Sequence, residues 1–164
     1  MSWWCGCDEG AKSLVEALEV NSALTSVNLL KSIGIEVAKK LVAVFRRHKT
    51  LKTLCGFKPN QKEANFRLCG LRPADGMLIA ADLEFNATLT HLNLSDNYLC
   101  GLDTNENGTY DSSCITALAE ALRVNTALNK LDVRYNRFSR MSTFHERQLQ
   151  ESVKGREDLK LLLL

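Results

Sequence analysis

Hydrophobic residues recur along this chain with two alternating spacings. Apolar pairs four positions apart, typical of one face of an amphipathic helix, occur at Leu14/Leu18, Leu41/Phe45, Ile79/Leu83, Leu118/Leu122 and Leu149/Val153. Downstream, apolar and polar residues alternate, as in Leu92/Leu94 and Leu131/Val133, which predicts short strands. The chain is therefore expected to repeat a helix-then-strand unit.

The repeat is also visible as direct self-similarity. The stretches EALEVNSALTSVNLL at 16–30, ADLEFNATLTHLNLS at 81–95 and EALRVNTALNKLDVR at 120–134 share their leucine and asparagine positions. A unit of about 28 residues cannot bury its apolar face alone, so neighbouring units stack side by side. We predict a single α/β solenoid domain over residues 1–164, with about five repeats, a curved parallel sheet on the concave face and helices on the convex face.

Two stretches carry a more specific motif. LTHLNLSDNYL at 89–99 follows the pattern L-x-x-L-x-L-x-x-N-x-L, and LNKLDVRYNRF at 128–138 places Asn136 in the asparagine slot. These stretches resemble leucine-rich repeats of the ribonuclease-inhibitor type, also found in nucleotide-binding innate-immune sensors. The resemblance covers nearly the whole chain, and it implies the solenoid fold while saying little about function.

The repeat is uneven. The leucines that open the strands are Leu24, Leu51, Leu89, Leu128 and Leu159, so the steps are 27, 38, 39 and 31 residues. We interpret 55–75 as an irregular extra strand, with Cys69 in the asparagine slot, and 100–113 as a loop insertion. Residues 1–9 are interpreted as a partial repeat or N-terminal cap and 139–164 as a C-terminal capping repeat, either in a small repeat protein or in a piece of a longer array.

Composition narrows the function classes. A hydrophobic fraction of 45% with 24% charged residues is ordinary for a globular domain, and the net charge of +2 favours neither nucleic acid nor a membrane surface. Six cysteines without a secretion signal indicate reduced thiols and a cytoplasmic protein. The spacing of cysteines and histidines that a zinc site needs is missing, so no cofactor is expected.

The stretch DTNENGTYD at 103–111 has the alternating oxygen-bearing residues of a calcium loop. Its weak candidate ligands are Asp103, Asn105, Asn107 and Asp111. The twelfth position of the loop is Cys114, where an EF-hand needs a bidentate glutamate. The pattern Asn107-Gly108-Thr109 also matches a glycosylation acceptor, which is expected to be idle without a secretion signal. We expect a contact loop at the rim of the sheet.

In such a repeat the side chains between the core-facing leucines point to the concave face. The early strands are basic there, and apolar side chains such as Leu68 occupy positions that a purely solvated surface does not need. The candidate partner-binding residues are Lys31, Lys52, Phe57, Lys58, Arg67, His91, Asp96, Asp132, Arg134 and Tyr135. The sequence therefore predicts a non-catalytic module that binds an unidentified protein through the concave face and the rim loops.

Two alternatives stay open. In the first, the chain is a structural or sensor segment of a larger receptor. In the second, which rests on resemblance of the repeat alone, it is a GTPase-activating protein of the Ran type. The arginines available for the second alternative are Arg46, Arg47, Arg67, Arg72 and Arg134. No nucleophile–base arrangement and no phosphate-binding glycine loop occurs in the sequence, so we expect no enzyme.

Overall fold

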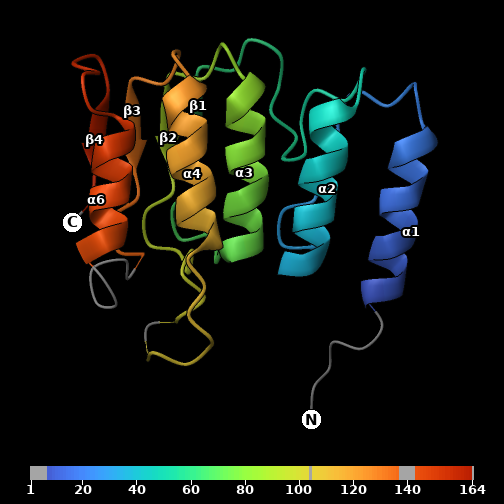
Figure 1. Cartoon of the computed structure of the whole chain (residues 1–164), viewed down its shortest axis with the longest axis horizontal. Coiled ribbons are helices and arrows are strands. Elements are labelled where there is room, and N and C mark those ends of the chain that lie inside the picture. The colour runs from blue at the N-terminus through green and yellow to red at the C-terminus, as the bar shows by residue number, and fades with distance from the viewer. Residues whose placement is uncertain (1–6, 104, 137–142, 164) are drawn as a thin grey trace.

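The computed structural model describes residues 7–103, 105–136 and 143–163 (Figure 1). The helices are α1 (Cys7–Val20), α2 (Ile35–Arg47), α3 (Pro73–Phe85), α4 (Ser113–Val124) and α6 (Thr143–Ser152). The strands are β1 (Glu63–Asn65), β2 (His91–Asn93), β3 (Lys130–Asp132) and β4 (Lys160–Leu162). The helices stand side by side in chain order, which gives the molecule one helical layer.

The four strands form one parallel sheet in the order β1-β2-β3-β4. Their middle residues are in register, with Ala64 opposite Leu92, Leu92 opposite Leu131 and Leu131 opposite Leu161. This row faces the helices, whereas the residues on either side of it face away, as the period-two geometry of a strand requires. The strands follow one another across the sheet in chain order, and each is three residues long.

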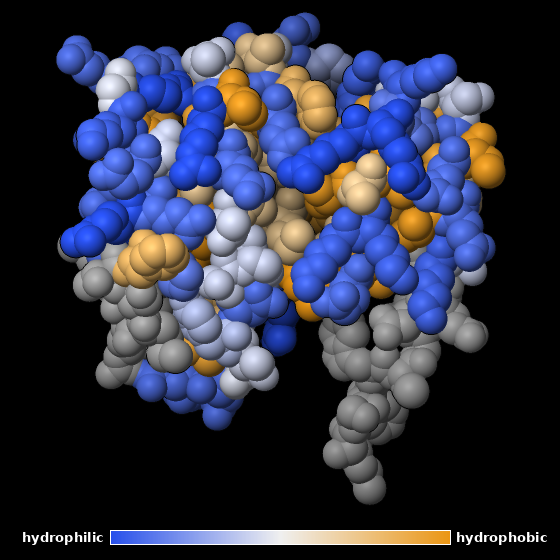
Figure 2. All heavy atoms as spheres, viewed as in Figure 1, coloured by the Kyte–Doolittle hydropathy of each residue, from blue (hydrophilic) through white to orange (hydrophobic). Residues whose placement is uncertain are grey.

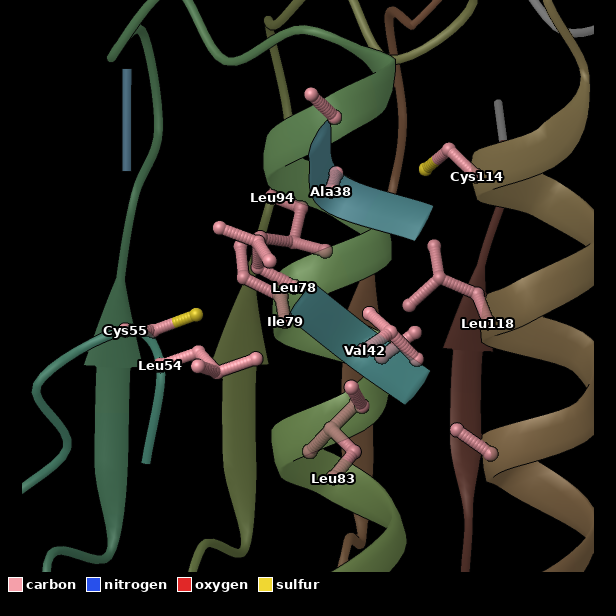
Figure 3. Close-up of a cluster of buried hydrophobic side chains, with 14 of the residues drawn as sticks. Ala38, Val42, Leu54, Cys55, Leu78, Ile79, Leu83, Leu94, Cys114 and Leu118 are labelled. Carbon is pink, nitrogen blue, oxygen red and sulfur yellow. The ribbon is translucent and has the colours of Figure 1, made fainter. Parts of the chain in front are cut away.

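The core lies between the sheet and the helical layer. Figure 3 shows Leu78 and Ile79 of α3 beside Leu94, with Leu118 of α4 in the same cluster, and these four side chains are fully buried. Burying a side chain of this size stabilises the folded state by roughly 1.5–3 kcal/mol. The outer surface of the helical layer carries mostly hydrophilic side chains with apolar patches between them (Figure 2).

Helix α3 is apolar on nearly every side because it lies between α2 and α4. Its Gly76 allows the close approach of α4, since a Cβ there would lie 2.0 Å from Cys114 Sγ. The parallel sheet with one layer of helices confirms the coarser prediction, an α/β fold like that of leucine-rich-repeat proteins. The number of repeats and the division of residues 1–164 into one domain with caps stay predictions.

Polar side chains close the corner where each helix turns into the next strand. The corner residues lie three positions before the strand-opening leucines: Asn21, His48, Asn86, Asn125 and Arg156. Asn86 Oδ1 accepts the N–H of Leu89 at 2.8 Å, and Asn125 Oδ1 accepts the N–H of Leu128 at 2.9 Å. Asn125 Nδ2 also donates to the Asn86 carbonyl at 2.8 Å, so one corner is tied to the previous one.

The corners at His48 and Arg156 use different chemistry for the same purpose. His48 Nδ1 accepts the N–H of Leu51 at 2.9 Å, and His48 Nε2 lies 2.7 Å from the Asn21 carbonyl, which assigns the hydrogen to Nε2. The Arg156 guanidinium donates to the carbonyls of Asn125 and Leu128. Side chains therefore link the corner at His48 to that at Asn21, the corner at Asn125 to that at Asn86, and the corner at Arg156 to that at Asn125.

A second row of asparagines closes the opposite ends of the strands. Asn97 is buried; its Nδ2 donates to the carbonyls of Phe66 and Leu94, and its Oδ1 accepts the N–H of Leu71 at 3.0 Å. Asn136 repeats this arrangement one step further along, donating to the Leu94 carbonyl at 2.8 Å. Buried backbone groups need such partners where the chain leaves the sheet.

The first strand-like segments do not belong to the four-stranded sheet. Residues 25–29 pair with 52–55, with Lys52 N donating to the Thr25 carbonyl at 2.8 Å and Leu29 N donating to the Leu54 carbonyl at 2.9 Å. The chain then turns at 58–61 and enters β1 without an intervening helix. Strand β1 thus lies within the segment 55–75, whose interpretation as an extra strand stays a prediction.

The two predicted caps fall partly outside the described residues. Residues 1–6 of the N-terminal segment 1–9, and residues 139–142 and 164 of the C-terminal segment 139–164, are not described. The described part of the latter contains α6 and β4, and β4 completes the sheet beside β3.

Asn97→Ala is predicted to destabilise the protein by about 3 kcal/mol, because it leaves buried backbone carbonyls and the N–H of Leu71 without partners. The free energy of unfolding measured by urea denaturation tests this. The matched control is Asn129→Ala, whose exposed side chain is expected to change the stability by less than about 0.5 kcal/mol. Equal effects of the two substitutions would contradict a structural role for the buried asparagines.

Candidate protein-interaction site

The structure divides the ten candidate residues into three groups. His91 and Asp132 lie on the outer face of the sheet, and Lys52, Phe57 and Lys58 border a groove at its interruption. The remaining five follow the ends of the strands: Lys31, Arg67, Asp96, Arg134 and Tyr135. They therefore do not form one continuous patch of uniform charge.

The face of the sheet turned away from the helices is polar and hollowed. A depression of about 420 Å³ crosses β1, β2 and β3. Its lining residues are Glu63, Ala64, Asn65, His91, Leu92, Asn93, Lys130 and Asp132. His91 is exposed, and its Nδ1 lies 2.9 Å from Thr90 Oγ1. Carboxylate, amide, imidazole and ammonium groups thus share one surface.

The backbone is left-handed at the residue three positions after the last residue of β1, β2 and β3, and also at Lys31. Lys31, Leu68, Asp96 and Tyr135 have φ values of 64°, 56°, 56° and 58°, and each directly precedes the slot held by Ser32, Cys69, Asn97 or Asn136. We call Arg67, Leu68, Asp96, Arg134 and Tyr135 the strand-end row. Left-handed backbone is uncommon for residues with a Cβ, so the turn fixes where each of these side chains projects.

Each arginine of the strand-end row forms an ion pair with an aspartate. Arg67 Nε donates to Asp96 Oδ2 at 2.9 Å, and Arg134 Nη2 donates to Asp132 Oδ2 at 2.7 Å. Burial works to raise the pKa of Asp132, but hydrogen bonds from the side chain and backbone of Arg134 outweigh it, and the pKa lies below its ordinary value. Between these pairs, Leu68 and Tyr135 are 71% and 64% exposed.

The burial of Phe57 differs from the expectation that this residue faces a partner on the concave surface. It is only 7% exposed and packs against Phe66 with ring centroids 6.1 Å apart, so it does not present an aromatic ring to a partner. The reason is local: the chain passes through Gly56 with φ of 72°, which ends the alternation that the sequence pattern assumes. Lys52 and Lys58 are exposed as expected from their polar character.

A groove of about 610 Å³ opens where the sheet is interrupted. Its lining residues are Phe45, Arg46, His48, Leu51, Lys52, Thr53, Phe57, Lys58, Pro59, Asn60, Phe85, Asn86, Ala87 and Thr88. Sequence reasoning missed Phe85 as a surface residue, because it ends an apolar helix and reads as core. It is 58% exposed, like Val20 and Val124, which end α1 and α4 at the equivalent position of the repeat.

A buried carboxylate accepts hydrogen bonds from the 52–55 segment. Asp82 of α3 accepts hydrogen bonds from Thr53 Oγ1 at 2.5 Å, Leu54 N at 2.7 Å and Cys55 N at 3.0 Å. Burial raises the pKa of Asp82 to about 6, although these hydrogen bonds favour the charged form and work against the shift. The segment 52–55, where the sheet is interrupted, is therefore fixed to α3 by hydrogen bonds.

The predicted contact loop is held together by its own residues. Asp103 Oδ1 accepts the N–H groups of Asn105 and Asn107 at 2.8 and 2.9 Å, and Asp111 Oδ1 accepts from Ser113. Leu102 and Gly108 form an antiparallel bridge across it. In the described part of the chain, no group of three or more His, Cys, Asp or Glu side chains is placed to hold a metal ion.

The arginines considered for a GTPase-activating role have structural partners. Arg46 pairs with Glu84, Arg47 with Glu19, Arg67 with Asp96 and Arg134 with Asp132, while the backbone N–H of Arg72 donates to Asp75. The guanidinium groups of Arg46, Arg47, Arg67 and Arg134 are thus engaged within the chain, whereas the contact of Arg72 is made by its backbone N–H.

Cys55, Cys69, Cys100 and Cys114 are free thiols. Burial raises the pKa of Cys55 and Cys114 well above the ordinary value, and that of Cys100 to about 12. A reactive cysteine needs the opposite shift, so these three favour packing over nucleophilic chemistry.

Fold and surface together define the class as an α/β leucine-rich-repeat-like chain with a polar sheet face and exposed apolar side chains at the strand ends. No protein-family model and no curated protein sequence matches it. A solved structure described as leiomodin-1 actin-binding site 2 aligns over 93% of this chain and 78% of its own, with 19% identity and a TM-score of 0.46. The tropomodulin C-terminal domain of Caenorhabditis elegans aligns over 87% and 90%, with 13% identity and a TM-score of 0.33.

These findings correct the sequence-based resemblance. No family model of the ribonuclease-inhibitor type matches, and the similar structures named above are of leiomodin and tropomodulin, so the assignment to the type found in innate-immune sensors is wrong. The uneven steps and the interrupted sheet give the physical reason, since a regular solenoid needs a constant unit. At these TM-scores the likeness carries no argument about the partner. In the described ranges, no helix combines the length and apolar character needed to cross a membrane.

The raised pKa of Asp82 predicts how stability changes with pH. The folded protein binds a proton more tightly, with a pKa of about 6 against 3.8 for the ordinary group, so the free energy of unfolding falls as pH rises through this window. The expected loss is about 3 kcal/mol between pH of about 4 and about 7.

Asp82→Asn isolates this effect from the other titrating groups. The difference in unfolding free energy between the two proteins, measured by urea denaturation along a pH series, is expected to change by about 3 kcal/mol across the window. Parallel pH profiles for the protein and the variant would contradict the buried carboxylate as described.

Proposed function

We propose that this chain is a non-catalytic module that binds another protein through the outer sheet face and the strand-end row. The single observation that carries the proposal is the exposure of Leu68 and Tyr135, two large apolar side chains on fixed left-handed turns. Both lie beside arginine–aspartate pairs, and Arg134 Cζ lies 6.0 Å from the centroid of the Tyr135 ring. Tyrosine and arginine are enriched among the residues that contribute most to protein binding.

The fixed position of the strand-end row supports a role in protein binding. The row stands directly on the buried asparagine network, because Asp96 and Tyr135 precede Asn97 and Asn136 in the chain. The backbone of the strand-end row is already fixed, so this chain loses little conformational entropy when a partner docks on it. More of the contact energy therefore appears as affinity. The adjacent sheet face adds hydrogen-bonding groups of both signs, which favour specificity.

The proposed partner is a protein, and the proposed location is the cytoplasm, which the free thiols support. Actin is included as a purified protein in a first test because the description of one similar structure names it, and the likeness itself does not assign it as the partner. The surface chemistry itself specifies a partner with an apolar contact for Leu68 and Tyr135 and charged groups near Arg67 and Arg134.

The test variant is Leu68→Asn with Tyr135→Asn. Asparagine tolerates left-handed backbone, so the turns are kept while the apolar contacts are removed. The matched control is Val20→Asn with Val124→Asn, which removes two exposed apolar side chains, 84% and 61% exposed, at the ends of α1 and α4. Quantitative affinity capture from cell extract, with cosedimentation on purified actin filaments as a separate arm, compares the proteins.

We expect partners captured by the unchanged protein to lose about tenfold or more in enrichment with the strand-end variant and to keep it with the control. Equal capture by all three proteins would contradict the proposed surface. Loss in the control alone would place the interface on the helical side. Cosedimentation that the strand-end variant abolishes would identify actin as a partner.

A further inference from the structure

The groove at the sheet interruption is separate from the strand-end row. It lies at the end of the molecule where α2 and α3 finish and the 52–55 segment begins. In a continuous repeat array a helix would follow residue 55, but here the chain reverses at Gly56 and turns through 58–61. The C-terminal ends of α2 and α3 border an open hollow of about 610 Å³.

The groove has an apolar floor with one exposed ring. Phe45, Leu51 and Phe57 are buried in its walls. Phe85 is 58% exposed and rests edge-on against Phe45, with ring centroids 5.6 Å apart at 81°. A phenylalanine held in this way is oriented by the core, while most of its surface still faces water. It therefore offers a fixed seat for an apolar side chain.

The rim of the groove is basic. Its lining residues include Arg46, His48, Lys52 and Lys58 and no aspartate or glutamate. Arg46 is neutralised by Glu84, with Nη2 2.5 Å from Oε1, whereas Lys52 and Lys58 have no ion-pair partner among the described residues. Two uncompensated ammonium groups thus flank the apolar floor.

We infer that the groove receives an extended acidic segment of a partner protein with an apolar side chain that packs on Phe85. The inference rests on the proposed function and names a second contact that deepens it. Complementary charge selects carboxylates for Lys52 and Lys58, and the exposed ring selects an apolar residue between them. Nucleic acid is disfavoured, because the basic surface is limited to these few groups and the net charge is only +2.

The experiment uses the whole chain and a short fluorescein-labelled peptide of glutamates with a leucine at its centre. Fluorescence anisotropy is expected to show binding that weakens as salt is added. Lys52→Glu with Lys58→Glu should weaken it by about tenfold or more, as expected when opposite charges at an interface are replaced by like charges. Phe85→Ser should weaken binding by about tenfold while the salt dependence stays the same.

Three controls complete the design. Lys12→Glu with Lys40→Glu makes the same change in net charge on exposed helix positions away from the groove, and binding should be unchanged. A glutamate peptide with serine at its centre should bind about tenfold more weakly than the leucine peptide. A labelled single-stranded oligonucleotide tests the nucleic-acid alternative.

Absence of peptide binding at low salt would overturn the inference, as would equal weakening by the two double charge reversals. Preference for the oligonucleotide, or for the serine peptide, would overturn it as well. If the peptide fails while the Leu68 and Tyr135 variant still loses its partners, the groove inference fails alone. If the peptide binds and capture is unaffected by that variant, the proposed strand-end surface fails instead.

Discussion

Side-chain hydrogen bonds at both ends of each short strand carry the architecture. A three-residue strand makes few backbone bonds, so the chain that enters and leaves it has many buried amides and carbonyls without partners. Asn86 and Asn125 satisfy them at one end, and Asn97 and Asn136 at the other. Because the side chains of Asn97, Asn125 and Asn136 also reach the neighbouring repeat, contacts that close a turn also hold the stack together.

The surface follows from this network. The turn before each asparagine slot is left-handed, so Asp96 and Tyr135 project at fixed positions beside the sheet. Where the repeat fails, a different group performs the same work: Asp82 accepts the N–H groups of Leu54 and Cys55. Asp82 lies on α3, so this helix still packs on the 52–55 segment, and the groove beside Phe85 opens next to it. The regular and irregular parts of the fold thus produce two chemically different surfaces.

Much of the fold could be predicted because leucine spacing reports burial directly. The pair Leu118/Leu122 lies in α4, and Leu92 and Leu131 face the core from neighbouring strands. The prediction for Phe57 was wrong because alternation assumes that a strand continues, and the chain reverses at Gly56. Neither periodicity nor motif predicts the bond between Asp82 and a strand 28 residues away, since that pairing exists only in three dimensions. The groove was missed for the same reason.

Amide hydrogen exchange tests the role of the side-chain network most directly. The amides of Leu71, Leu89 and Leu128 donate to asparagine side chains at 3.0, 2.8 and 2.9 Å. If these bonds hold the repeats together, the three amides will exchange as slowly as those of Leu92 and Leu131 in the central strands. Exchange as fast as in the exposed loop at 105–109 would contradict the account.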